Sequence, residues 1–181
     1  MPDNPAKQPS DEVDENQIQQ SRTEGDAYRT SVTYMATRVA NDGGTTEAGD
    51  YLVGYAQEEA EGMYHLEGEG DLEFVEPDAE NCHVEVVVAD AGDKRFVPYC
   101  DVSVTLARDG EEYGPWDVPF VWHPGVYHYG KNVEVPESGT YDLHVTVDPP
   151  AFHRHDKQNG DRYAEPVEVT FEEIDVETGQ G

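Results

Sequence analysis

Two stretches of alternating apolar and polar residues constrain the fold of this chain most. In residues 81–89 and again in residues 96–107, every second position is apolar. In the first stretch these positions are Cys82, Val84, Val86 and Val88. Because successive side chains of a strand point to opposite faces, each stretch predicts a strand with one buried face. The turn-forming residues between the two stretches predict that the strands pair as a hairpin.

Further strands follow from the same reasoning, and they define the domain organisation. They are predicted at residues 51–56, 71–75, 131–135, 137–147 and 164–174. Short strands separated by turn signals are typical of an all-β sandwich, which we place at residues 47–176. Residues 1–46 are polar and predict a disordered or loosely ordered acidic tail, although residues 28–40 fit helical and strand spacing equally. Residues 177–181 are expected to be a flexible C-terminus.

The charge of the chain restricts its partners. The formal net charge is −29, and residues 47–181 carry 32 acidic and 7 basic side chains against 8 and 4 in residues 1–46. A surface this negative repels nucleic acid and anionic lipid, so neither is expected as a partner. The composition favours adaptation to high salt, as in a halophile, over the alternative of an acidic surface made for a basic partner.

Several functional classes lack their sequence signatures. No apolar stretch is long enough to span a bilayer, so no membrane insertion is expected. The first residues lack the features of a signal peptide, which predicts either a mature chain or a cytoplasmic one. Cys82 and Cys100 are predicted to be buried free thiols. No nucleophile or zinc-protease motif is present, so the chain is not expected to be an enzyme.

Three segments rich in histidine are candidates for one metal site. His83 and Glu85 share a strand face at spacing i, i+2, His128 lies in an aromatic segment before a glycine, and His155 precedes Asp156. Asp156 is expected to orient the imidazole of His155. We predict that His83, Glu85, His128 and His155 converge on a single ion.

Other interpretations of these residues remain open. A solvated outer strand face explains His83 and Glu85 without a metal, and a lone histidine is often structural. Imidazole and carboxylate ligands suit Cu2+, Fe2+, Zn2+ or Mn2+, and the spacing of the residues does not choose among them. His123 and the thioether of Met63 are secondary ligand candidates. A blue-copper site is disfavoured because Cys82 points away from His83.

The order of these segments resembles the iron-transport-associated family of periplasmic ferrous-iron uptake proteins. The resemblance rests on His83-x-Glu85, on His128-Tyr129-Gly130 and on Arg154-His155, and it extends over residues 50–175. It implies an immunoglobulin-like sandwich, a homodimer, an extracytoplasmic or cell-surface location and a membrane iron permease as partner. It also implies that the matching residues bind copper or iron.

One departure from the family concerns its methionine ligand. Where bacterial members place this Met before the His-Tyr-Gly loop, this chain has Phe120, Val121 and Trp122. A ligand set without sulfur favours Fe2+, Mn2+ or Cu2+ over Cu+. With this ligand set, the resemblance implies a metal-binding accessory protein for Fe2+ uptake. The alternative is an adhesion or assembly sandwich that binds no metal.

Overall fold

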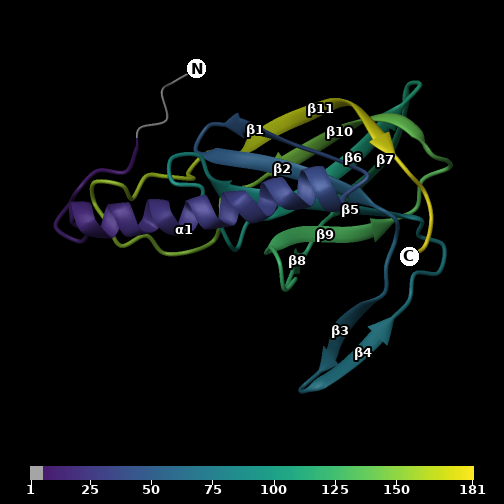
Figure 1. The fold of residues 1–181 in the computed structure, drawn as a ribbon, viewed down its shortest axis with the longest axis horizontal. Coiled ribbons are helices and arrows are strands. Elements are labelled where there is room, and N and C mark those ends of the chain that lie inside the picture. Colours follow the sequence, from purple (N-terminus) through teal and green to yellow (C-terminus); the bar gives the residue numbers. More distant parts are fainter. Residues whose placement is uncertain (1–5) are drawn as a thin grey trace.

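The computed structural model of the protein describes residues 6–181 (Figure 1). Within this range the chain forms one long helix, a π-helical turn at Met35–Val39 and eleven strands. The elements are α1 (Glu15–Tyr34), β1 (Asp42–Ala48), β2 (Tyr51–Glu58), β3 (Met63–Gly68), β4 (Asp71–Val75), β5 (Cys82–Asp90), β6 (Val102–Arg108), β7 (Glu111–Asp117), β8 (Phe120–Val121), β9 (His128–Val133), β10 (Gly139–Val147) and β11 (Val167–Val176).

Two sheets pack face to face and enclose the main core. One has the strand order β1-β2-β5-β9-β8 and the other β11-β10-β6-β7. Apolar side chains of both sheets meet between them, and the largest fully buried ones include Tyr51, Tyr141, Leu106 and Leu143. The predicted β-sandwich is confirmed. A third, two-stranded sheet, β3-β4, projects away from the sandwich (Figure 1).

The predicted hairpin between residues 81–89 and 96–107 is wrong. β5 pairs with β2 and β9, whereas β6 pairs with β10 and β7 in the opposite sheet. The two stretches share one isolated β-bridge, between Ala89 and Phe96, and do not form a ladder. Alternation specifies that a strand has a buried face, but both sheets of a sandwich offer such a face. The prediction that Cys82 and Cys100 are buried free thiols is confirmed.

Residues 15–34 form the helix α1, in place of the disordered or loosely ordered tail predicted for residues 1–46. The helix begins at Asp14, whose carboxylate accepts from the amide of Gln17 while the Gln17 side chain accepts from the amide of Asp14. This capping box satisfies amide groups that the first turn leaves without partners. Residues 1–5 of the predicted tail lie outside the described residues.

The helix covers the outer face of the larger sheet, as Figure 1 shows. Val32 and Met35 pack against Leu52, Val87 and Val126, which point away from the main core. A second apolar layer therefore forms on this face. It explains why β5 is buried along its whole length although only alternate residues face the sandwich interior.

The C-terminal residues are attached to the sandwich, whereas the sequence predicted a flexible end at residues 177–181. The amide of Thr178 donates to Ser138, that of Gly179 to Asn81 and that of Gly181 to Ala60. Across residues 6–181, the chain contains no helix with the length and apolar character needed to cross a bilayer.

Candidate metal centre

His83 and Glu85 lie on the face of β5 that points away from the sandwich core. They alternate with Cys82, Val84 and Val86, which belong to that core. On an uncovered sheet their side chains would reach solvent, yet His83 is 1 % and Glu85 5 % exposed. α1 and the segment before β9 provide the cover, and the Tyr28 hydroxyl of α1 donates to the carbonyl of Tyr127.

His128 opens β9 and is also buried. In the pairing of β5 with β9, Glu85 lies opposite Gly130. His128 is two residues from Gly130 on the same face of β9, so its ring extends toward His83 and Glu85. The ring centroids of His83 and His128 are 6.3 Å apart at an angle of 80°.

One potential ligand atom from each of His83, Glu85 and His128 lies within 4.8 Å of the others. Oε1 of Glu85 is 3.4 Å from Nε2 of His128 and 3.9 Å from Nε2 of His83. Among the described residues, the buried side-chain atoms without a hydrogen-bond partner are Nε2 of His83, Nε2 of His128 and Oε2 of Glu85. Leaving a buried polar atom unpaired costs about 1–3 kcal/mol. Two unpaired ring nitrogens close to one oxygen of a carboxyl group whose other oxygen is also unpaired fit a bound cation.

The outer nitrogens of both rings are held by hydrogen bonds that set the tautomers. Nδ1 of His83 lies 2.8 Å from Oδ1 of Asn132, and Nδ1 of His128 lies 3.3 Å from the carbonyl of Val126. Both partners are acceptors, because the Asn132 amide nitrogen donates to the carbonyl of Glu61. Each Nδ1 therefore carries the proton, and each Nε2 presents a lone pair to the site.

Space for an ion between the two rings depends on Gly130. A Cβ at this position would lie 3.1 Å from Nε2 of His83 and 3.1 Å from Nε2 of His128. Gly130 lies within strand β9. The glycine leaves open the space that both nitrogens face.

Burial sets the protonation of the three groups before a cation binds. Desolvation lowers the pKa of His128 to about 4, with His83 and His123 adding to the effect, and it also lowers the pKa of His83. Desolvation raises the pKa of Glu85 to about 8, and the carboxylates of Glu58 and Glu61 contribute to the same shift. At neutral pH the short Glu85–histidine contacts thus join neutral groups. A cation would favour the Glu85 carboxylate, which then becomes its anionic ligand.

His155 lies outside this cluster. Its side chain is 91 % exposed, and its Nδ1 is 3.2 Å from a carboxylate oxygen of Glu12. Asp156 does not orient it as predicted, because its carboxylate accepts from Ser10, Gln158 and Asn159.

The loop that carries His155 is anchored at the far end of β5 from His83. Nε of Arg154 donates to the carbonyl of Arg162, and the Arg162 guanidinium contacts the Asp90 carboxylate at 2.7 Å. Asp90 is the last residue of β5, seven residues and roughly 23 Å along the strand from His83.

The two secondary candidates differ in their surroundings. His123 lies near the site, with its ring centroid 6.1 Å from that of His128. Its Nδ1 accepts from the amides of Gly125 and Val126, so Nε2 carries the proton and is a donor, which is unfavourable for a ligand. Met63 is half-buried at the start of β3, opposite Val75, and stays a prediction.

Sequence reasoning missed Asn132 and Tyr28. Asn132 lies two residues after Gly130 and pairs with His83 between β9 and β5. The register of these two strands would therefore have predicted the contact between Asn132 and His83. Tyr28 lies on α1, which the sequence interpretation left as part of a tail. Nothing in its local sequence indicates that it reaches the segment before His128.

The comparison with protein families shows that this chain belongs to the family described as Fe2+ transport protein, whose model matches residues 48–177. The resemblance seen in the sequence is thereby confirmed. The family is defined by transport and not by a reaction. α1 lies before the matched range.

Solved structures show the same fold at low sequence identity. FetP of uropathogenic E. coli strain F11 has 20% identity and a TM-score of 0.58, with 74% of this chain and 93% of that chain covered. A copper-bound variant of FetP has 20% identity, 73% and 89% coverage and a TM-score of 0.57. Copper-reconstituted P19 from Campylobacter jejuni has 16% identity, 75% and 94% coverage and a TM-score of 0.59. No curated protein matches the sequence.

Proposed function

We propose that this protein is a metal-binding accessory protein for Fe2+ uptake, with His83, Glu85 and His128 as ligands of the transported cation. The observation that carries the proposal is a buried cluster in which the unpaired Nε2 atoms of His83 and His128 lie close to the Glu85 carboxyl group, one oxygen of which is also unpaired. The family assignment supports a role in iron transport. The copper-bound structures of FetP and P19 support binding of a transition metal by this fold.

The donor set favours borderline divalent cations. Two neutral imidazoles and one carboxylate suit Cu2+, Fe2+, Zn2+ or Mn2+ better than Cu+, which prefers sulfur ligands. Three protein ligands do not fill the coordination shell of these ions, so water or a further donor completes it. Incomplete coordination by protein ligands suits a transported cation that the protein must release.

His155 remains a predicted fourth ligand. Within one chain it is exposed and lies outside the cluster of His83, Glu85 and His128, so it would need another position to bind the same ion. The predicted homodimer offers such a position, because a partner copy can present an exposed histidine to this site. The extracytoplasmic location and the transfer of iron to a membrane permease are likewise proposals that rest on the family.

A metal titration of the purified, untagged protein tests the ligand assignment. We expect about one tight equivalent of Cu2+ or Fe2+ per chain, and His128→Ala should weaken binding on the order of a hundredfold, because it removes one ligand of three. His153→Ala, an exposed neighbour of His155, is the matched control. Unchanged affinity in His128→Ala would refute the site.

His155→Ala separates a three-ligand centre from one completed by a second copy. Unchanged affinity and stoichiometry indicate that His83, Glu85 and His128 are sufficient. A loss comparable to that of His128→Ala, together with a dimeric mass, assigns His155 to the site of a partner copy. Elemental analysis separates both from an adhesion module, which would bind no metal.

A further inference from the structure

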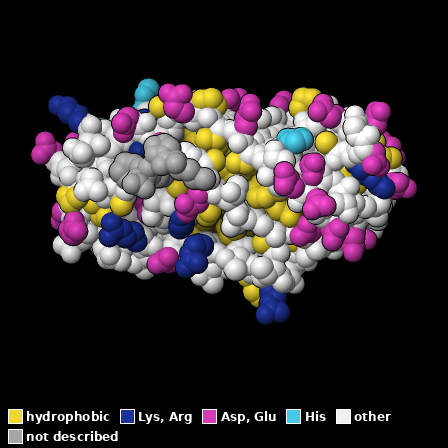
Figure 2. All heavy atoms as spheres, turned by 90° about the horizontal axis from the view of Figure 1, so that it is seen from above, with side chains coloured by type: hydrophobic (Ala, Val, Ile, Leu, Met, Phe, Trp, Pro, Cys, Tyr) yellow, Lys and Arg dark blue, Asp and Glu magenta, His cyan; other side chains and the backbone are white. Residues whose placement is uncertain are grey.

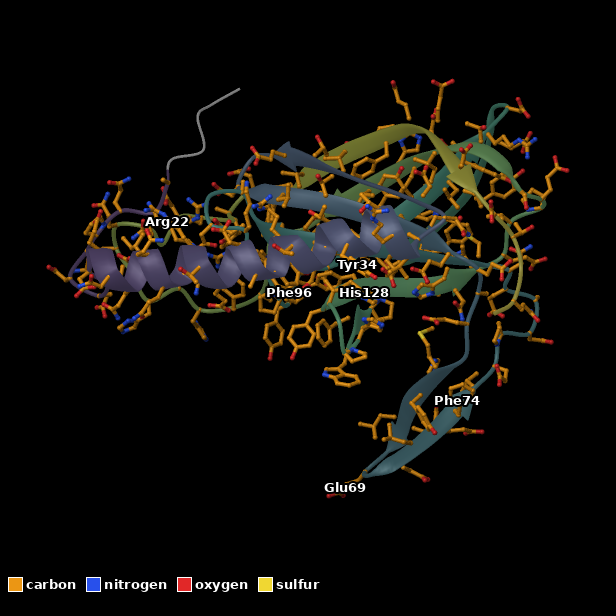
Figure 3. The ribbon with its side chains drawn as sticks, in the orientation of Figure 1. Arg22, Tyr34, Glu69, Phe74, Phe96 and His128 are labelled. Carbon is orange, nitrogen blue, oxygen red and sulfur yellow. The ribbon has the colours of Figure 1, made fainter. Side chains whose placement is uncertain are left out.

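An open hollow of about 500 Å³ lies beside the candidate metal centre. The charged side chains of the described residues that line it are all carboxylates, and they belong to Glu58, Glu59, Glu61 and Glu76. Phe74 of β4 forms part of the wall. Figure 3 shows Phe74 and His128 on the same side of the molecule, below α1 in this view.

Glu58 connects this hollow with the metal centre. It is the last residue of β2, and the pairing of β2 with β5 places it directly opposite His83. Directly opposed residues of antiparallel strands have Cβ atoms about 4.5–5.5 Å apart on the same face of the sheet. Glu58 therefore projects from the outer face that also carries His83 and Glu85, where it is half-buried.

The backbone of Glu61 is fixed to the residue that orients His83. Its amide donates to Oδ1 of Asn132 at 3.3 Å, and its carbonyl accepts from Nδ2 of Asn132 at 2.7 Å. The same Oδ1 accepts from Nδ1 of His83. The carboxylates of Glu58 and Glu61 are close enough to Glu85 that both raise its pKa. Negative charge is thus gathered immediately outside the metal centre.

The protein itself does not neutralise this charge. Within residues 6–181, the ion pairs of Lys and Arg involve carboxylates other than the four that line the hollow. Beside Glu58 lie two buried atoms without a hydrogen-bond partner, Nε2 of His83 and Oε2 of Glu85. A cleft lined by one sign of charge concentrates ions of the opposite sign, so the hollow fits the approach of a cation to these atoms.

We propose that Glu58 and Glu61 form an acidic vestibule that captures a hydrated divalent cation and passes it to the metal centre. This inference rests on the proposed function, for which it names the entry route. Because Glu58 is half-buried, salt screens its attraction for a cation less than that of a fully exposed carboxylate. The vestibule differs in this respect from the acidic surface elsewhere.

Rates of Cu2+ binding to the metal-free full chain test the proposal. Stopped-flow quenching of tryptophan fluorescence gives the association rate constant, and a chase with excess chelator gives the dissociation rate constant. We expect the Glu58→Gln, Glu61→Gln protein to bind Cu2+ at least about tenfold more slowly than the wild type, with a dissociation rate constant within about twofold of it. The matched control is Glu168→Gln, Glu172→Gln, which removes the same charge from exposed positions of β11 in the opposite sheet. Both of its rate constants should stay within about twofold of the wild type.

Equal association rate constants in the two doubly substituted proteins would overturn the proposal, because an equal fall in both would reflect net charge alone. A change confined to the dissociation rate constant would overturn it too, because it would make the two carboxylates ligands of the bound ion. Melting curves show whether the variants remain folded, and Glu61→Gln alone, at an exposed position, serves if the double substitution lowers the melting temperature. A wild type that binds no Cu2+ would refute the proposed function and the vestibule together. A wild type that binds Cu2+, beside variants of equal rate, would refute the vestibule alone.

Discussion

Gly130 shows how one missing side chain shapes the candidate metal centre. Its neighbours in space are the Nε2 atoms of His83 and His128, and a Cβ on residue 130 would be 3.1 Å from each. Since neither nitrogen has a hydrogen-bond partner, a methyl group at residue 130 would occupy the space proposed for the ion.

Gly130→Ala is therefore expected to weaken Cu2+ binding by at least about tenfold, while the fold is retained. Isothermal titration and a melting curve of the metal-free variant measure the two effects. Gly68→Ala is the control, because a Cβ there meets only the Cβ of Asp71 at 4.0 Å. Equal Cu2+ affinities of Gly130→Ala and Gly68→Ala would contradict the proposal that the ion occupies the space beside Gly130.

Glu85 couples metal binding to pH. Its pKa is raised by burial to about 8, from 4.5 for an exposed glutamic acid. Between these values the folded metal-free protein binds more protons than the unfolded chain. The contribution of Glu85 to the free energy of unfolding is fully present below about pH 4.5 and is lost as pH rises through about 8.

Two measurements follow from this shift. The free energy of unfolding of the metal-free wild type should fall more between about pH 5 and about pH 9 than that of Glu85→Gln, which has no carboxyl proton to lose. Metal binding near pH 6.5 should release about one proton in the wild type and almost none in Glu85→Gln. Calorimetry in two buffers of different ionisation enthalpy measures that release, and equal release in both proteins would contradict the assignment of Glu85.

At the scale of elements, α1 converts an outer sheet face into a buried one. The helix contains few large apolar residues, and its buried positions are Ile18, Gly25 and Val32. Gly25 lies against the turn after β5, where a Cβ would be 1.6 Å from the carbonyl oxygen of Asp93. The close approach of helix and turn thus depends on a residue that lowers intrinsic helix stability.

Gly25→Ala tests whether this packing outweighs helix propensity. In an exposed helix the substitution would stabilise by about 0.5–1 kcal/mol. Here we expect a loss of about 1–3 kcal/mol in the free energy of unfolding, because the methyl group forces the helix away from Asp93. Urea denaturation measures it, with the exposed Thr23→Ala as control. A higher free energy of unfolding in Gly25→Ala than in the wild type would contradict the close contact between α1 and Asp93.

At the scale of the whole molecule, acidic side chains far outnumber basic ones, with 40 Asp and Glu against 11 Lys and Arg. Figure 2 shows Asp and Glu side chains spread over the face seen from above, with fewer Lys and Arg among them. Like charges at this density repel one another in the folded state, and salt reduces that repulsion. The adaptation to high salt predicted from composition would be a property of this surface and not of the core.

The melting temperature is therefore expected to rise with KCl from low salt to about molar concentration, where the screening length falls to about 3 Å. A scan of melting temperature against KCl concentration measures this. Sucrose solutions of matched osmolarity are the control for effects not due to charge. An equal melting temperature at low and molar salt would argue against adaptation to brine.

The sequence by itself determined the class of the fold and the elements of the site. Alternation predicts strands because side-chain direction in a strand is a local property. The pair His83 and Glu85 and the segment containing His128 were for this reason recognisable before the structure. The family assignment followed from the order of the same segments.

Only the tertiary structure decided which of these residues meet. Pairing of β5 with β9 brings His128 to Glu85, and Arg162 holds the loop of His155 near Asp90 instead. α1 buries the site although its own sequence carries a weak apolar pattern. The pairing of strands, the anchoring of the loop and the packing of the helix on the sheet depend on contacts between residues far apart in the chain. Local periodicity does not predict such contacts.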